Sequence, residues 1–298
     1  MCAKRVVGIG GAHVDWIAKM GRPNMPGAST PGSVETYVGG CCLNSLRVLA
    51  QLSADCSMTM ISARGADTAG ELVQTAIEEA GLDDQSAVFL DRSTPTYTAI
   101  LNAQGDVQAA VADMVLYEES LPRHLRRREV RDTLHNADIL VIDANLPGAA
   151  IKTITSAFEG MIVGLAISPA KASRLIPSAK HFDIVFMNHR EKAALGDLQT
   201  AGFKDSVITQ GNGNVLVSMD GAEQSMRVPP VPSVVDVTGA GDALAGATLA
   251  ALISLADFTL FDAVKLGITA AGKTVKERGP IAKLDWADLL AEAKSYDS

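Results

Sequence analysis

Short apolar runs recur through the second half of the chain, and segments long enough for helices separate them. Runs of this kind, without polar alternation, are typical of parallel strands buried on both faces. The alternating order therefore predicts a three-layer α/β/α sandwich with a mainly parallel central sheet, whose ligands gather at the C-terminal ends of the strands. The runs are Ile139–Asp143, Met161–Ile167, Ile184–Met187 and Ser206–Thr209.

Two extended regions interrupt this order in the first half of the chain. Residues 33–38 alternate between apolar and polar positions, as an exposed strand does, and residues 96–102 and 107–111 flank a short polar turn, as in a hairpin. We expect them to form a small separate sheet lying over the main one. The segments near 13–38 and 96–117 are thus candidates for a lid on a single domain spanning residues 1–298.

Composition limits the classes of function. The chain has 298 residues, of which 47% are hydrophobic, and a formal net charge of −8. It can bury a large core, and its acidity argues against nucleic acid or an anionic membrane as the main partner. No run reaches the roughly 18 apolar residues of a membrane helix. The cysteines lack metal-ligand spacing, so a reducing cytoplasm is the expected compartment.

The stretch from Asp236 to Ser254 combines a glycine turn, a carboxylate and an Ala- and Leu-rich helix that begins near Gly239. The first turn of such a helix presents unpaired N–H groups to an anion. Asp242 would repel a phosphate, so we interpret it as a general base beside an anion site formed by Gly239, Ala240 and Gly241. The alternative is an acid that only complements the helix dipole.

This stretch resembles the C-terminal signature of the PfkB, or ribokinase-like, family of carbohydrate and nucleoside kinases. The usual form is Asp-Thr-x-Gly-Ala-Gly-Asp-x-Phe; Val237 and Leu244 depart from it, and both are apolar. The resemblance implies a catalytic base at Asp242 and an anion hole at the Gly-Ala-Gly turn. It also implies a ribokinase-like fold, with ATP and Mg²⁺ as cofactors. Some family members hold a monovalent cation such as K⁺ partly through the residue equivalent to Asp236.

The N-terminal part of the chain supplies candidates for substrate binding. Asp15 follows the first strand, where its carboxylate can accept hydrogen bonds from neighbouring sugar hydroxyls or, alternatively, only cap its own turn. Gly39 and Gly40 permit close approach to a ligand, and Asn44 offers an amide donor and acceptor. Together these residues are similar to the family's N-terminal pattern, although His13 replaces the usual Asn.

Two further elements resemble family motifs on the nucleotide side. Asn188 and Glu191 match the family's Asn-x-x-Glu and can hold Mg²⁺ through water, although the same spacing is an ordinary capping box. Thr209 and Gly211 match the family's Thr-x-Gly, which follows a strand near the nucleotide.

Three other patterns are interpreted as structural. Glycines 8, 10 and 11 do not complete a dinucleotide fingerprint, because no helix follows them. Residues 267–274 fit the P-loop expression letter by letter, but their context predicts the middle of one helix that continues toward Arg278. The basic run at residues 126–128 is interpreted as a solvated helix face.

The resemblance covers nearly the whole chain and implies an ATP-dependent kinase for the primary hydroxyl of a sugar or nucleoside. Residues 29–32 and 110–117 look like pseudouridine kinases in particular, whereas Leu43 stands where that subgroup commonly has Arg. Ribokinase- or fructokinase-like activity is the close alternative, and a non-catalytic nucleoside-binding protein is the alternative from another class. An exposed lid edge suggests a homodimer.

Overall fold

A nine-stranded sheet forms the centre of the computed structural model, which describes residues 4–24 and 27–294. Its strands run in the order β15-β14-β13-β12-β11-β10-β1-β4-β6. They pair in parallel from β6 to β13, and an antiparallel hairpin closes the other edge. The strands are β1 (Arg5–Ile9), β4 (Ser57–Ile61), β6 (Asp83–Asp84), β10 (Ile139–Asp143), β11 (Met161–Leu165), β12 (Ile184–Asn188), β13 (Asp205–Thr209), β14 (Val215–Met219) and β15 (Ala222–Met226).

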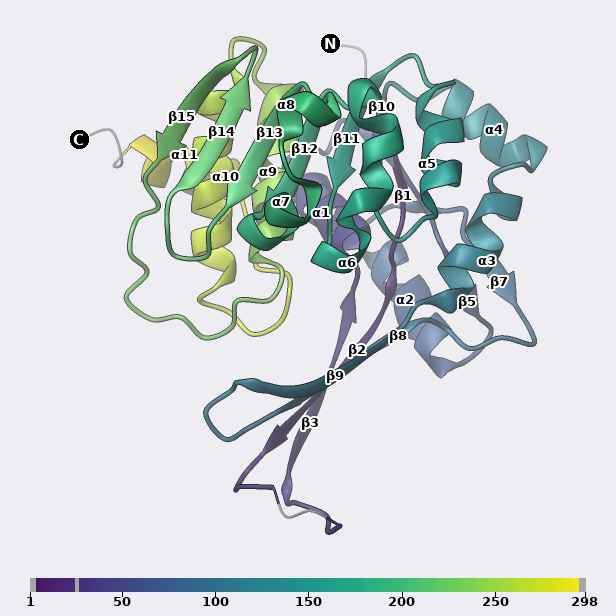
Figure 1. Cartoon of the computed structure of the whole chain (residues 1–298), viewed down its shortest axis with the longest axis vertical. Helices are drawn as coiled ribbons and strands as arrows, with labels where there is room; N and C mark the ends of the chain where they lie inside the picture. The colour runs from purple at the N-terminus through teal and green to yellow at the C-terminus, as the bar shows by residue number, and fades with distance from the viewer. Residues whose placement is uncertain (1–3, 25–26, 295–298) are drawn as a thin grey trace.

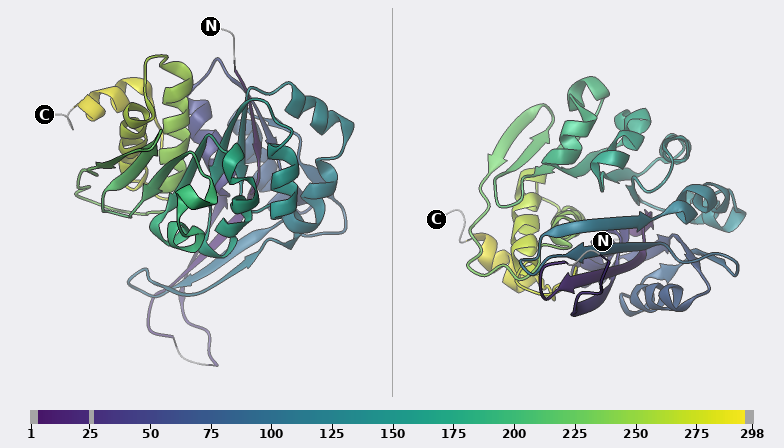
Figure 2. Two further views of the ribbon diagram at one scale, coloured as in Figure 1. Left: turned by 45° about the horizontal axis from the view of Figure 1, so that its top comes forward. Right: turned by 60° about the horizontal axis from the view of Figure 1, so that its bottom comes forward.

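Helices cover both faces of this sheet, as Figures 1 and 2 show. One apolar core lies between the sheet and α1, α9 and α10, and a second lies on the opposite face against α3 and α5. This is the predicted three-layer architecture. The helices are α1 (Cys41–Leu52), α2 (Thr68–Glu79), α3 (Val115–His124), α4 (Arg128–His135), α5 (Gly148–Thr155), α6 (Pro169–Ala172), a 3₁₀ segment (Ser173–His181), α7 (His189–Leu195), α8 (Leu198–Ala201), α9 (Ala240–Ser254), α10 (Leu260–Thr274) and α11 (Trp286–Lys294).

A four-stranded sheet projects from the body (Figure 1). Its order is β3-β2-β8-β9, with β2 (His13–Met20), β3 (Gly32–Gly39), β8 (Thr96–Leu101) and β9 (Val107–Asp113). The extended segments and the hairpin expected from the sequence lie here. The sequence analysis did not predict strand β2. Asp15 belongs to this strand and therefore does not lie in a turn. A further pair, β5 (Ala63–Gly65) and β7 (Ala87–Phe89), lies beside α3.

No helix within the described ranges is both long and apolar enough to cross a bilayer.

Candidate functional site

The glycine turn before α9 has the geometry of an anion-binding helix start. Gly239 is the N-cap and has a φ of 75°, in the left-handed region that favours glycine. A Cβ there would lie 2.2 Å from the carbonyl oxygen of Pro280, whereas a Cβ on Gly241 would meet no heavy atom within 4 Å. The first N–H groups of α9, which lack intrahelical partners, therefore begin a helix beside open space.

Asp242 lies in this first turn of α9 and is partly buried. Its pKa is raised to about 6, chiefly by burial and also by the nearby charges of Asp143 and Asp15. Hydrogen bonds from Asn44 and from the Cys41 thiol act in the opposite direction. A carboxylate with a pKa just below neutrality is ionised at pH 7 and basic enough to accept a proton.

Close packing of α1 on α9 brings Asn44 to Asp242. The Nδ2 of Asn44 donates a hydrogen bond of 2.9 Å to Asp242 Oδ2, across 198 positions of sequence. Gly246 permits the approach, because a Cβ there would lie 2.4 Å from the carbonyl oxygen of Ser45. The candidate catalytic base and one candidate substrate-binding residue are thus held side by side.

The substrate candidates from the first two lid strands meet at the root of the lid. A Cβ on Gly39 would lie 2.2 Å from Asp15 Oδ2, so only glycine leaves room for this carboxylate. Gly40 has a φ of 109° and caps α1. His13 Nε2 lies 3.2 Å from Asp15 Oδ1.

Asn44 Oδ1 is buried without a hydrogen-bond partner in the described part of the chain. Asp15 Oδ1 is also buried and accepts no well-aligned hydrogen bond there, although His13 Nε2 lies within ion-pair distance of it. A buried acceptor left unpaired costs ~1–3 kcal/mol. The Asn44 oxygen is therefore the stronger candidate to accept a hydroxyl donor from a ligand.

Asn188 and Glu191 form a complete capping box at the start of α7. The Glu191 carboxylate accepts hydrogen bonds from the backbone N–H and the Nδ2 of Asn188, both at 2.8 Å. Glu191 is buried, which raises its pKa, and the charge of Asp242 raises that pKa further. Asn188 and Glu191 therefore do cap α7, which was the structural alternative to a role in holding Mg²⁺. Glu191 nonetheless lies close enough to Asp242 for the two charges to interact.

Thr209 and Gly211 lie at the same edge of the sheet. Thr209 ends β13 and pairs in register with Asn188, the last residue of β12. Gly211 has a φ of 63°, and a Cβ there would meet no heavy atom within 4 Å. All four nucleotide candidates therefore lie at the C-terminal ends of two adjacent parallel strands or directly after them.

Asp236 ties the turn before α9 to a loop far along the chain. One carboxylate oxygen accepts from the N–H and hydroxyl of Thr238, and the other accepts from the Gly279 N–H at 3.1 Å. These hydrogen bonds outweigh burial and lower the pKa of Asp236. With both oxygens engaged by N–H donors, Asp236 is suited to bracing the turn.

The P-loop-like segment is helical, as its context predicted. Gly267 packs inside α10, where a Cβ would lie 2.3 Å from Thr248 Oγ1. Lys273 Nζ lies 3.3 Å from Asp288 and 3.6 Å from Glu292 of α11. This lysine therefore joins two helices. The helix ends at Thr274 and does not continue toward Arg278.

Sequence reasoning missed a buried polar chain beside the site. Asp143 is fully buried at the end of β10 and accepts 2.8 Å hydrogen bonds from the N–H groups of Gly11 and Asn145. Burial raises its pKa. Lys171 Nζ donates to Asn145 Oδ1 at 2.8 Å. A terminal Asp on an otherwise apolar strand was the available signal.

The comparisons with known proteins agree with the fold. The chain is 37% identical to a carbohydrate kinase from Agrobacterium tumefaciens, covering 98% of this chain and 97% of the other with a TM-score of 0.84. It is 18% identical to a ribokinase from Arabidopsis thaliana complexed with ribose and ATP, covering 98% and 99% with a TM-score of 0.84, a likeness of fold alone. It is 24% identical over 259 residues, or 80% of each chain, to a pseudouridine kinase from Escherichia coli strain K12.

The description "pfkB family carbohydrate kinase" matches residues 3–287, which is nearly the whole chain. The matched range contains the central sheet, the separate small sheet and the glycine turn before α9. The chain belongs to the pfkB family of carbohydrate kinases.

Proposed function

We propose that this kinase transfers the γ-phosphoryl group of ATP to the primary hydroxyl of a nucleoside, with pseudouridine as the preferred acceptor. The observation that carries the proposal is Asp242, a carboxylate of raised pKa in the first turn of α9 that is hydrogen-bonded to the buried Asn44. An acid is unfavourable for anion binding alone. It is favourable where a hydroxyl must lose its proton next to a phosphoryl group.

The proposed reaction divides the work between two groups at the start of α9. Asp242 accepts the proton of the attacking hydroxyl, and the N–H groups of residues 239–241 stabilise the charge on the phosphoryl oxygens. Asp15 and Asn44 orient the acceptor, since the buried Asn44 Oδ1 lacks a hydrogen-bond partner in the described ranges and the buried Asp15 Oδ1 accepts no well-aligned hydrogen bond there. The Asn44 amide then bridges base and substrate, which fixes their relative position.

Mg²⁺ fits this site through water rather than through direct ligands. Within the described ranges no cluster of three or more His, Cys, Asp or Glu side chains is arranged to bind a metal directly. The charge of Asp242 raises the pKa of Glu191, and the charge of Asp143 raises the pKa of Asp242, which marks an excess of negative charge that a hydrated cation would relieve. When bound, Mg²⁺ would neutralise charge on the ATP phosphates.

The proposed reaction uses no monovalent cation at Asp236, because both oxygens of this carboxylate already accept N–H hydrogen bonds.

In this proposal the ATP phosphates lie between α9 and the C-terminal ends of β12 and β13, near Asn188, Glu191, Thr209 and Gly211. Gly211 supports this placement, since its left-handed backbone and open surroundings leave room for a ligand next to the main chain.

The preference for pseudouridine is supported by the relative of that name and by His13. His13 Nε2 lies beside Asp15, and its Nδ1 lies 3.5 Å from the Tyr117 hydroxyl. An imidazole next to the sugar-binding carboxylate offers a ring on which a nucleobase can stack. A sugar kinase is the alternative, supported by the 37% identical carbohydrate kinase.

The four-stranded sheet is proposed as a lid over the acceptor. Its strand β3 contacts the loop beside the anion site, since Glu35 lies 3.2 Å from Arg278 and a Cβ on Gly279 would lie 2.7 Å from the Tyr37 ring. The four-stranded sheet also exposes apolar side chains, including Val34 at 66% and Val111 at 68%. We propose that these side chains pair with the lid of a second copy in a homodimer.

The described cysteines are free thiols, which supports a cytoplasmic location.

An ADP-release assay with pseudouridine, uridine, ribose, fructose and adenosine tests the proposed function. We expect the highest kcat/KM for pseudouridine and product phosphorylated at the primary hydroxyl, identified by ³¹P NMR. Uridine is the matched comparison, because it carries the same ribose through a different glycosidic bond. Asp242→Asn should lower kcat by at least ~100-fold while substrate binding persists.

Two results would redirect the proposal. A higher kcat/KM for ribose or fructose would assign a sugar kinase, which keeps the mechanism and changes the acceptor. Binding of pseudouridine by calorimetry without ADP release from any acceptor would support a non-catalytic nucleoside-binding protein.

A further inference from the structure

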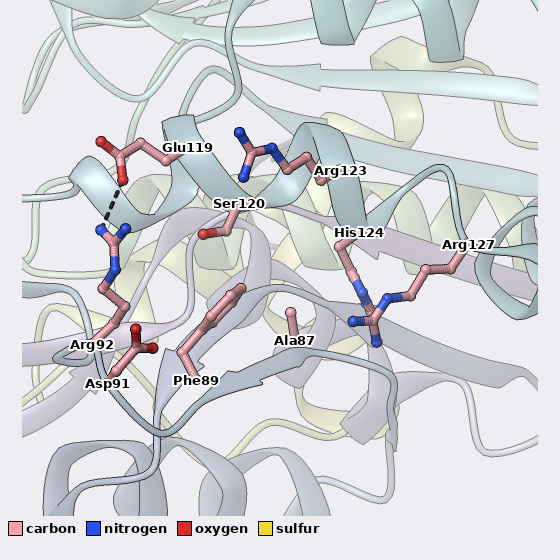
Figure 3. A pocket seen from close by; sticks show the side chains of 9 residues that line it. All are labelled: Ala87, Phe89, Asp91, Arg92, Glu119, Ser120, Arg123, His124 and Arg127. Atoms are coloured by element: carbon pink, nitrogen blue, oxygen red, sulfur yellow. Dashed lines mark hydrogen bonds and ion pairs between the residues drawn. The ribbon is translucent and has the colours of Figure 1, made fainter.

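A cavity of about 550 Å³ lies between β7, α3 and the loop that leads into the lid, and none of the kinase-site residues lines it (Figure 3). Small-molecule sites have volumes of roughly 300–1,000 Å³, so it can hold a metabolite. Its lining includes Arg127, one residue of the basic run that the sequence analysis had assigned to a solvated face. The charged and polar lining residues are Asp91, Arg92, Glu119, Ser120, Arg123, His124 and Arg127.

The cavity is basic on a protein that is acidic overall. Three arginines face two carboxylates in the lining, while the whole chain carries a formal charge of −8. Arg92 pairs with Glu119 at 2.8 Å, but both side chains are about half exposed, so this pair is weak. Arg123 and Arg127 have no ion-pair partner in the described part of the chain. Two guanidinium groups therefore remain available to an anion.

The other walls supply what an organic anion needs besides charge. Phe89 and Ala87 contribute an apolar wall, and Ser120 contributes a hydroxyl (Figure 3). His124 is only 7% exposed, and its Nε2 lies 2.6 Å from the carbonyl oxygen of Gln85, to which it donates. Its buried Nδ1 is consequently an acceptor, and it has no partner among the described residues. A lone pair that accepts hydrogen bonds does not attract an anion, so the recognition of a phosphate depends on the arginines and the Ser120 hydroxyl.

The cavity lies where the proposed lid joins the body. Arg92 belongs to the loop between β7 and lid strand β8, and α3 begins directly after lid strand β9. The same helix reaches the acceptor side of the kinase site. Tyr117 is fully buried, accepts a 3.0 Å hydrogen bond from the N–H of Ala12 and donates one of 2.8 Å to its carbonyl oxygen, next to His13. A ligand that joins Arg92 to Arg123 would thus connect both lid hinges to the acceptor loop.

We propose that this cavity binds a small phosphate monoester between Arg92, Arg123 and Arg127, and that its occupation changes acceptor binding through α3 and the lid hinges. The phosphate replaces Glu119 as the partner of Arg92, and the organic part lies against Phe89. Binding does not depend on the identity of the acceptor. The effect on acceptor KM rests on the proposed lid, so ligand binding in the cavity and its effect on KM are measured separately.

Isothermal titration calorimetry with inorganic phosphate and with ribose 5-phosphate tests binding in the full chain. The variant is Arg123→Gln combined with Arg127→Gln. The matched control is Arg126→Gln combined with Arg131→Gln, which removes the same charge from exposed positions of the same segment outside the cavity lining. We expect the cavity variant to bind at least tenfold more weakly than the wild type and the control to bind like the wild type. Loss of two charge-assisted contacts accounts for that factor.

Tighter binding of ribose 5-phosphate than of phosphate identifies an ester as the ligand, and equal binding assigns the site to the phosphate group itself. Three results would overturn the proposal: no binding of either probe at millimolar concentration, equal binding by all three proteins, or equal weakening in both variants. In the kinetic arm, saturating ribose 5-phosphate should change the acceptor KM at least twofold in the wild type and control only. An unchanged KM would refute the coupling to the lid.

Discussion

Keeping Asp242 ionised in a partly buried position should reduce the stability of the fold, and removing the charge should restore that stability. Burial raises the pKa of Asp242 from 3.8 to about 6. A difference of about two pKa units corresponds to ~3 kcal/mol. Asp242→Asn abolishes this ionisation and keeps an oxygen that can accept from Asn44. We therefore expect the inactive variant to be more stable than the wild type at neutral pH.

The sign follows from proton binding. Between the unfolded pKa of Asp242 and its folded value of about 6, the folded state binds more protons than the unfolded state, so wild-type stability falls as pH rises through that window. Asp242→Asn does not lose stability in this way. Its free energy of unfolding should exceed that of the wild type only slightly near pH 4, and the difference should grow up to about pH 6. Above about pH 6 the difference should reach at most ~3 kcal/mol, which corresponds to roughly 5 °C in Tm for a chain of this size.

Urea unfolding and thermal scans at pH 4.5 and pH 8 measure this difference. Asp262→Asn is the matched control with the opposite expectation, because hydrogen bonds from Thr259 lower the pKa of Asp262 at the start of α10. That carboxylate stabilises the fold above its unfolded pKa, so its removal should destabilise the protein at pH 8. The reasoning about Asp242 is refuted if Asp242→Asn is no more stable than wild type at pH 8, or if its gain is the same at both pH values.

Three other substitutions test single parts of the site. Gly239→Ala forces a Cβ against Pro280 at a φ of 75°, so kcat should fall by ~100-fold or more through loss of the anion site, and a wild-type kcat would exclude that role. Lys273→Ala should change kcat/KM by less than ~3-fold, because its ammonium pairs with carboxylates of α11; loss of nearly all turnover would indicate a P-loop. Asp15→Asn should raise the acceptor KM by roughly 10- to 100-fold, and an unchanged KM in steady-state assays would remove Asp15 from substrate binding.

The local patterns of the chain predicted the buried parallel strands and the helix after the glycine turn correctly, because these elements depend on neighbouring residues. Apolar runs gave the parallel strands β10 to β13, and the glycine turn gave the start of α9 within one residue. The P-loop expression was rejected on the same grounds, since helical spacing on both sides of Gly267 is also local. Strand β2 was missed because its partners, β3 and β8, are what hold it extended.

The sequence by itself thus determined the fold class, the family and the residue types available for chemistry. Only the tertiary structure decided which of them meet. Asn44 contacts Asp242 because α1 and α9 pack closely at Gly246, and the pKa of Asp242 is raised because that packing excludes water. Asp143, Tyr117 and the arginine-lined cavity beside the lid likewise depend on contacts between distant segments. Burial and long-range hydrogen bonds are properties of the packed chain, and no local window of sequence contains them.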